Sequence, residues 1–176
     1  IFKSVFRELR VWTDDRPGDR SPPPESSAPW KLIMHMDGRT CVITGAGRGI
    51  GRGIAEHLGR EGANVVVNYR SSADSAEACC EIIRREEGDA IASQADVTEV
   101  VEVEAMREEA HDAFGSVDVL VNNAGITKDT RFVKMSREDW DKVMDVNLGG
   151  MFNCTKTFYD DIWEAEEGRL INISSI

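Results

Sequence analysis

The sequence predicts an α/β fold in which helices cover both faces of a doubly wound parallel sheet. Three observations lead to this prediction. Short runs rich in β-branched residues alternate with longer stretches whose apolar residues recur three and four positions apart, and a glycine-rich turn follows the first run. Alternation at this spacing is typical of parallel sheets, and we expect about five strands in the order 3-2-1-4-5. A length of 176 residues suits a single domain.

Five strands are expected from the β-branched runs. A run such as NVVVNY is apolar toward both sides of a strand, which indicates burial between two helical layers. The expected strands are 40–44, 64–69, 90–94, 118–122 and 169–173.

Four helices are expected between these strands, because apolar residues recur there at helical spacing. The last helix is expected to begin at Ser136, whose hydroxyl can cap it together with Asp139 three positions later. The expected helices are 50–61, 73–87, 98–114 and 137–165.

Residues 1–36 differ in composition from the rest of the chain. All five prolines lie there, from Pro17 to Pro29, among many Asp, Arg, Ser and Glu residues. Such a stretch buries too little apolar area to offset its chain entropy. We expect a disordered tail or a non-native upstream extension over residues 1–36 and an ordered domain over residues 37–176.

The charge balance excludes several classes of partner. The formal net charge is -11, from 21 basic and 32 acidic residues, so we expect neither nucleic-acid binding nor binding to an anionic membrane. No apolar run reaches the roughly 18 residues of a membrane-spanning helix. The four cysteines lack C-x-x-C spacing and the three histidines lie far apart, so no metal site is predicted. We expect reduced core thiols in a cytoplasmic protein.

The strongest chemical signal is the sequence Thr44-Gly45-Ala46-Gly47-Arg48-Gly49-Ile50-Gly51, which joins the first strand to the first helix. Glycines at such a turn let backbone amides and the positive end of the helix approach a diphosphate. No Lys-Ser or Lys-Thr pair follows, which excludes a P-loop, and Ile50 stands where the commonest G-x-G-x-x-G pattern has its third glycine. We therefore predict a dinucleotide site that includes Gly45, Arg48, Gly49, Ile50 and Gly51.

The end of the second strand indicates which dinucleotide is bound. Enzymes that use NAD usually have an acidic residue there, about 20 residues after the glycines, whereas this chain has Arg70 and Ser71. Arg70, with Arg48, could form charge-assisted bonds to a 2′-phosphate, so NADP(H) is preferred to NAD(H). The alternative is that both arginines are surface residues without a ligand.

These motifs together resemble the short-chain dehydrogenases/reductases, whose fold is of the Rossmann type. Thr44 to Gly51 matches the family's T-G-x-x-x-G-x-G, and four further motifs follow in the family's order up to residue 176. These are the adenine-contacting pair Asp96-Val97, the N-N-A-G sequence Asn122-Asn123-Ala124-Gly125, the helix asparagine Asn147, and the strand Ile171-Asn172-Ile173-Ser174-Ser175. The resemblance implies that Asn123, Ala124 and Gly125 contact the cofactor and that Ser175 and Asn147 take part in catalysis.

The resemblance also implies an activity. In the family, NADPH gives hydride to a carbonyl carbon, a tyrosine protonates the oxygen, a lysine four residues later lowers the pKa of that tyrosine, and the helix asparagine holds a water. The chain is most similar to reductases of 3-oxoacyl thioesters, of the acyl-carrier-protein type or acting on acetoacetyl-CoA. No Tyr-x-x-x-Lys sequence is present. We therefore expect a C-terminally truncated, inactive portion of an NADPH-dependent reductase.

Two other functions stay open. The same motifs serve short-chain reductases of other carbonyl or alcohol substrates, and a non-catalytic module could use the turn only to bind NADP(H). The resemblance further implies that the full-length protein forms a homodimer or homotetramer, partly through the helix that carries Asn147.

Overall fold

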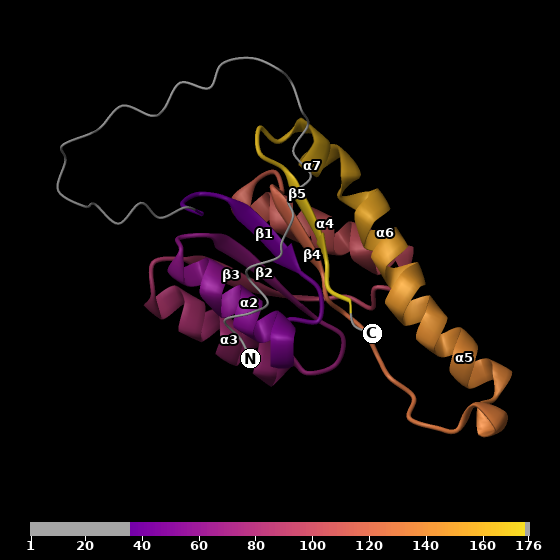
Figure 1. Cartoon of the computed structure of the whole chain (residues 1–176). Coiled ribbons are helices and arrows are strands. Elements are labelled where there is room, and N and C mark those ends of the chain that lie inside the picture. Colours follow the sequence, from indigo (N-terminus) through magenta and orange to yellow (C-terminus); the bar gives the residue numbers. More distant parts are fainter. Residues whose placement is uncertain (1–35, 175–176) are drawn as a thin grey trace, which may run out of the picture. The chain divides into compact units, whose positions relative to one another are not determined.

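The structure is a computed structural model that describes residues 36–174. It contains a parallel sheet of five strands in the order β3-β2-β1-β4-β5, which confirms the predicted order (Figure 1). The strands are β1 (Thr40–Ile43), β2 (Asn64–Tyr69), β3 (Asp89–Gln94), β4 (Val119–Asn122) and β5 (Arg169–Asn172). The predicted tail, apart from Met36, lies outside the described residues.

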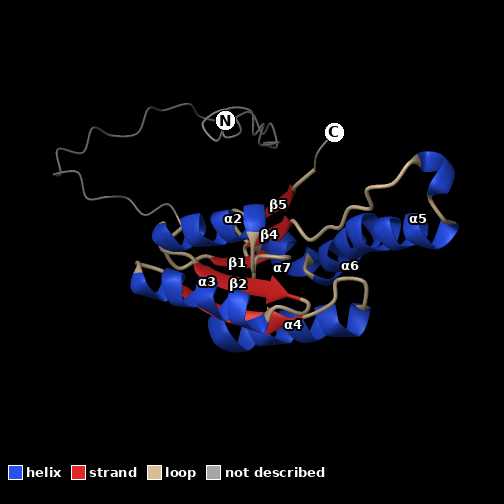
Figure 2. Ribbon diagram, turned by 90° about the horizontal axis from the view of Figure 1, so that it is seen from below, coloured by secondary structure: helices blue, strands red, loops and turns tan. Residues whose placement is uncertain are grey.

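Helices lie on both faces of the sheet, as the apolar runs predict (Figures 1 and 2). The helices α2 and α3 cover one face, and α4 with the segment α5 to α7 lies on the other. Their bounds are α2 (Gly49–Arg60), α3 (Ala73–Arg85), α4 (Val100–Phe114), α5 (Arg137–Met144), α6 (Gly150–Thr157) and α7 (Tyr159–Glu164). A short 3-10 turn, η1 (Phe132–Lys134), precedes α5, and a π turn, η2 (Asp145–Gly149), joins α5 to α6.

The core is divided into two layers by the sheet. Successive residues of a strand point to opposite faces, so Cys41 and Ile43 pack with α2 and α3, whereas Val42 packs with α4 and α6. Strands β1 and β4 are buried along their whole length. This double coverage explains the apolar runs CVI, VVV and VLV in the central strands β1, β2 and β4.

The final helical segment differs from the single helix predicted over 137–165. Ser136 caps its start as expected, since the backbone N–H of Asp139 donates to the Ser136 hydroxyl at 3.0 Å. The segment then opens into η2 and breaks again at Phe158. Phe158 is fully buried, and its backbone dihedral angles are not those of an α-helix. The prediction of one continuous helix is wrong because tertiary contacts of Phe158 and Asp161 with α4 outweigh local helical periodicity.

No helix in residues 36–174 is long and apolar enough to cross a membrane.

Candidate functional site

The glycine-rich turn lies where β1 ends and α2 begins, as the sequence predicts. Gly45 and Gly49 have φ values of +64° and +59°, a conformation that side chains with a Cβ rarely adopt. A Cβ on Gly51 would lie 2.4 Å from Nδ2 of Asn123, so the close approach of α2 to the loop after β4 requires glycine there. Ile50 and Arg48 are exposed beside the turn.

The first turn of α2 is suited to an anion. It contains no acidic residue, and Arg48 at the N-cap position makes no capping hydrogen bond with its side chain. The backbone N–H groups of a helix's first turn have no partners within the helix and carry a partial positive charge. With the glycines, this arrangement fits a diphosphate.

Thr44 joins the glycine turn to the end of β4. Its hydroxyl accepts hydrogen bonds from the backbone N–H groups of Asn123 and Ala124, each at 2.9 Å. In return, Nδ2 of Asn123 donates to the carbonyl oxygens of Thr44 and Gly45 at 2.8 and 3.3 Å. The predicted residues Gly45, Gly51, Asn123 and Ala124 are therefore brought together at the carboxyl ends of β1 and β4.

A second buried polar residue, Asn68, holds the other side of the turn. Its Oδ1 accepts from the backbone N–H of Gly45 at 3.1 Å, and its Nδ2 donates to the carbonyl oxygen of Ala95 at 3.1 Å. Neither Thr44 nor Asn68 was predicted as an individual site residue. Each is a polar residue near the carboxyl end of a buried strand, a placement that other polar residues of the sequence share.

Arg70 and Asp96 lie together where β2 and β3 end. An Arg70 guanidinium nitrogen is 3.6 Å from Oδ2 of Asp96, and Ser71 is exposed next to it. Partial burial works against ionisation of Asp96, but hydrogen bonds from Thr98 and the charge of Arg70 outweigh it and lower the pKa of this carboxyl below its usual value. Val97 is buried against Gly150 of α6.

Asn147 lies in the π turn and faces the loop that follows β4. Its Oδ1 accepts from the backbone N–H of Ile126 at 2.8 Å, and its Nδ2 donates to the carbonyl oxygen of Ile126 at 3.0 Å. Gly125 adjoins this contact, since a Cβ there would be 3.4 Å from Oδ1 of Asn147. Both hydrogen-bonding atoms of the Asn147 side chain are therefore engaged by backbone.

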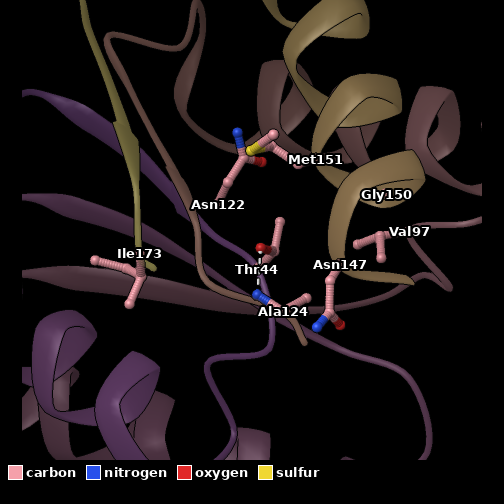
Figure 3. A pocket seen from close by; sticks show the side chains of 8 residues that line it. All are labelled: Thr44, Val97, Asn122, Ala124, Asn147, Gly150, Met151 and Ile173. Atoms are coloured by element: carbon pink, nitrogen blue, oxygen red, sulfur yellow. Dashed lines mark hydrogen bonds between the residues drawn. The ribbon is translucent and has the colours of Figure 1, made fainter. Parts of the chain in front are cut away.

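A small cavity lies between these elements (Figure 3). Its volume of about 30 Å³ has room for at least one water molecule. Oδ1 of Asn122 is buried and has no hydrogen-bond partner among the described residues, whereas its Nδ2 donates to Oγ1 of Thr155 and Oδ1 of Asn172. The cavity is lined by Thr44, Val97, Asn122, Ala124, Asn147, Gly150, Met151 and Ile173.

Ser174 is exposed after β5, and the predicted catalytic residue Ser175 lies outside the described residues. Within residues 36–174, no three His, Cys, Asp or Glu side chains are grouped so that they could hold a metal ion. The four cysteines are buried and unpaired. Burial raises the pKa of Cys41, Cys80 and Cys154 to about 12.

The short chain dehydrogenase family matches residues 39–176 of the sequence. The chain belongs to this family. It is 46% identical over 138 residues to the 3-oxoacyl-[acyl-carrier-protein] reductase FabG of Staphylococcus aureus, covering 78% of this chain and 56% of that protein. It is 43% identical over 141 residues to the 3-oxoacyl-[acyl-carrier-protein] reductase of Synechocystis, covering 80% and 57%.

Solved structures of the family superpose on the described fold. A short chain dehydrogenase from Burkholderia cenocepacia in complex with NADP has a TM-score of 0.73 and 33% identity, covering 78% of this chain and 55% of that one. A dehydrogenase/reductase from Sinorhizobium meliloti has a TM-score of 0.77 and 34% identity, covering 81% and 56%. The chain thus spans little more than half the length of these relatives.

Proposed function

We propose that this chain binds NADP(H) at the carboxyl edge of its sheet. The observation that carries the proposal is the fit of the glycine turn to a diphosphate. A Cβ on Gly51 would collide with the loop after β4, Gly45 has a positive φ, and the first turn of α2 is free of acidic side chains. The diphosphate would bind the amides from Gly49 to Gly51.

The other predicted residues would bind the rest of the nucleotide along the same edge. Arg70, Ser71 and Arg48 would bind the 2′-phosphate, and Asp96 with Val97 would contact the adenine, at the ends of β2 and β3. Asn123, Ala124 and Gly125 lie at the end of β4, where they would contact the cofactor nearer its nicotinamide. The NADP complex of the Burkholderia cenocepacia relative supports this choice of nucleotide.

For the whole protein, we propose NADPH-dependent reduction of a 3-oxoacyl thioester to the 3-hydroxyacyl thioester. The bound nucleotide would supply hydride to the keto carbon. Asn147 would position the loop after β4 through Ile126, and Ser175 would donate a hydrogen bond to the substrate carbonyl. The two 3-oxoacyl-[acyl-carrier-protein] reductases support the substrate class. The 176 residues contain no Tyr-x-x-x-Lys, so we expect this chain alone to bind nucleotide without turnover.

Calorimetric titration of the folded chain with NADPH and NADH tests the nucleotide site. We expect saturable binding of both, tighter for NADPH. An Arg70→Ala variant should lose most of the preference, whereas Arg131→Ala, an exposed arginine in the loop before η1, should bind like the wild type. A folded chain that binds neither nucleotide at millimolar concentration contradicts the proposal.

We also propose that the full protein self-associates through the last helical segment. Phe152 and Trp163 are 63% and 75% exposed, and the Trp163 ring stacks on that of Tyr159. Exposed apolar side chains gathered on one segment are typical of protein interfaces. Sedimentation of the full wild-type protein should give a dimer or tetramer, and the Trp163→Glu variant should dissociate more readily. If the wild type and the variant both sediment as monomers, this proposal is contradicted.

A further inference from the structure

Arg70 and Asp96 are placed side by side by the pairing of β2 with β3. Tyr69 is opposite Gln94 in the register, so the residues that follow each strand leave the sheet together. Two hydrogen bonds extend the pairing beyond the strands. The backbone N–H of Ala95 donates to the carbonyl oxygen of Tyr69, and Nε2 of Gln94 donates to that of Arg70, both at 3.0 Å.

The carboxylate of Asp96 is fixed in orientation. Its Oδ1 accepts from the backbone N–H and the hydroxyl of Thr98, at 3.0 and 2.8 Å. The loop that carries it is held on its other side by Nδ2 of Asn153, which donates to the carbonyl oxygens of Val97 and Thr98. The free oxygen, Oδ2, is left facing Arg70 at 3.6 Å. Among the described residues, no other carboxylate lies within 4 Å of the Arg70 guanidinium.

The pair is open to competition from a ligand. The Arg70 side chain is 54% exposed and that of Asp96 is 26% exposed, so water screens their attraction and the pair is weak. A phosphate monoester carries nearly two charges and three acceptor oxygens, which makes it the stronger partner for a guanidinium. A ribose hydroxyl, by contrast, can donate to a carboxylate.

We propose that Asp96 determines nucleotide preference by sharing Arg70 with the 2′-phosphate of NADP(H). This rests on the proposed nucleotide site. In the free protein Arg70 is held by Asp96, so NADPH must displace the carboxylate to gain the guanidinium, whereas NADH leaves the pair intact. Arg70 therefore favours NADPH, Asp96 moderates that preference, and the ratio of the two affinities depends on their contact.

The variant Asp96→Asn tests the proposal, because asparagine keeps an acceptor for Thr98 and for adenine but loses the charge. We expect the ratio of NADPH affinity to NADH affinity to rise about three- to fivefold in calorimetric titrations of the whole chain. The matched control is Asp145→Asn. Asp145 lines the same cavity of about 650 Å³ as Arg70 and Asp96, but makes no ion pair with Arg70. Its ratio should stay at the wild-type value.

The double variant Arg70→Ala/Asp96→Asn distinguishes two ways in which Asp96 could act. Asp96 could compete with the 2′-phosphate for Arg70, or its negative charge could repel the phosphate directly. If Asp96 acts through Arg70, removing its charge in the Arg70→Ala background should leave the ratio unchanged. An equal rise in both backgrounds overturns the proposal, as does an Asp96→Asn ratio no higher than that of Asp145→Asn. If the wild type binds neither nucleotide, the nucleotide site itself fails.

A measurement on the unaltered chain covers the case in which Asp96→Asn does not fold. The NMR signal of the Arg70 Nε–H should shift on addition of adenosine 2′-monophosphate, together with the Asp96 carboxyl carbon, as the pair separates. Adenosine 5′-monophosphate carries the adenine but no 2′-phosphate, so it should leave the Arg70 signal unmoved even where its adenine shifts the Asp96 signal. An Asp96 signal that does not respond to bound 2′-monophosphate contradicts displacement.

Discussion

Asn147 and Ile126 exchange two hydrogen bonds, at 2.8 and 3.0 Å, between the π turn and the loop after β4. The side chain of Asn147 thus satisfies both backbone polar groups of Ile126, with one hydrogen bond at each of its two polar atoms. Its role in this structure is to position the loop that begins with Asn123, Ala124 and Gly125. A helix that opens into a π turn at this point is in keeping with the frequent use of such turns at functional sites.

Asn147→Leu should lower the free energy of unfolding by about 1–3 kcal/mol, because Ile126 would keep two half-buried backbone groups without partners. Urea unfolding measures the change. Asp145→Asn, an exposed substitution in the same π turn, is the control and should stay within about 0.5 kcal/mol of the wild type. Equal stability of the leucine variant and the control would show that the contact contributes nothing.

Gly51→Ala should destabilise the fold by about 1–3 kcal/mol and weaken NADPH binding roughly tenfold, since its Cβ would collide with Asn123 and with the carbonyl oxygen of Gly45. Gly53→Ala is the matched control in the same helix. No atom lies within 4 Å of its added Cβ, so it should stabilise the helix by about 0.5–1 kcal/mol. Thermal unfolding and calorimetric titration of both variants check this, and similar behaviour of the two would contradict the collision.

Asp161 is 5% exposed and accepts two hydrogen bonds from Arg107, at 2.5 and 2.9 Å, and one from Ser116. Nε2 of His111 is also 2.9 Å from Oδ1 of Asp161, although its N–H is not aligned for a hydrogen bond.

Asp161→Ala would leave a partly buried guanidinium unpaired, so we expect a loss of about 2–4 kcal/mol in urea unfolding. Asp161→Asn should cost less because it can still accept hydrogen bonds. The control is Asp160→Ala, a substitution at an exposed position. If Asp161→Ala loses no more stability than Asp160→Ala, the ion pair between Asp161 and Arg107 does not stabilise the fold.

Alkaline pH should destabilise the protein through its buried thiols. Burial raises the pKa of Cys154 from 9.0 to about 12, so this thiol contributes stability that is complete below pH 9 and is lost as the pH rises toward 12. The loss is about 1.4 kcal/mol per pH unit for one thiol in that window. Between pH 7.5 and 10.5, the wild type should therefore lose about 2 kcal/mol more in urea unfolding than Cys154→Ala. Parallel losses in the two proteins would be evidence against a buried thiol.

The strands could be predicted from the sequence because short β-branched runs such as that of β2 stand between stretches of helical periodicity. The cap at Ser136 could be predicted because its partner is only three residues away. The conformation of the glycine turn could likewise be predicted, since the positive φ values of Gly45 and Gly49 favour glycine.

Other features depend on residues distant in the sequence and could not be predicted. Thr44 bonds to a backbone group 79 residues away, and Asn68 to one 23 residues away, so nothing local distinguishes them from other polar residues at strand ends. The break at Phe158 lies beside two such features, the full burial of Phe158 and the contact of Asp161 with Arg107, which lies 54 positions earlier. Periodicity alone predicts a continuous helix there.

The position of β1 at the centre of the sheet has a consequence for biosynthesis. Its partner β2 follows within one helical crossover, but its other partner, β4, is made much later. Thr40, the first residue of β1, is hydrogen-bonded to Asp118, which directly precedes β4 and lies 78 positions further along the chain. While the chain emerges from the ribosome, β3, β2 and β1 can assemble as a half-sheet in which β1 is an edge strand with unpaired backbone N–H and C=O groups. Pairing with β4 closes that edge, and because it joins segments far apart in the sequence, this step is expected to be slow and the open edge can meanwhile pair with another chain.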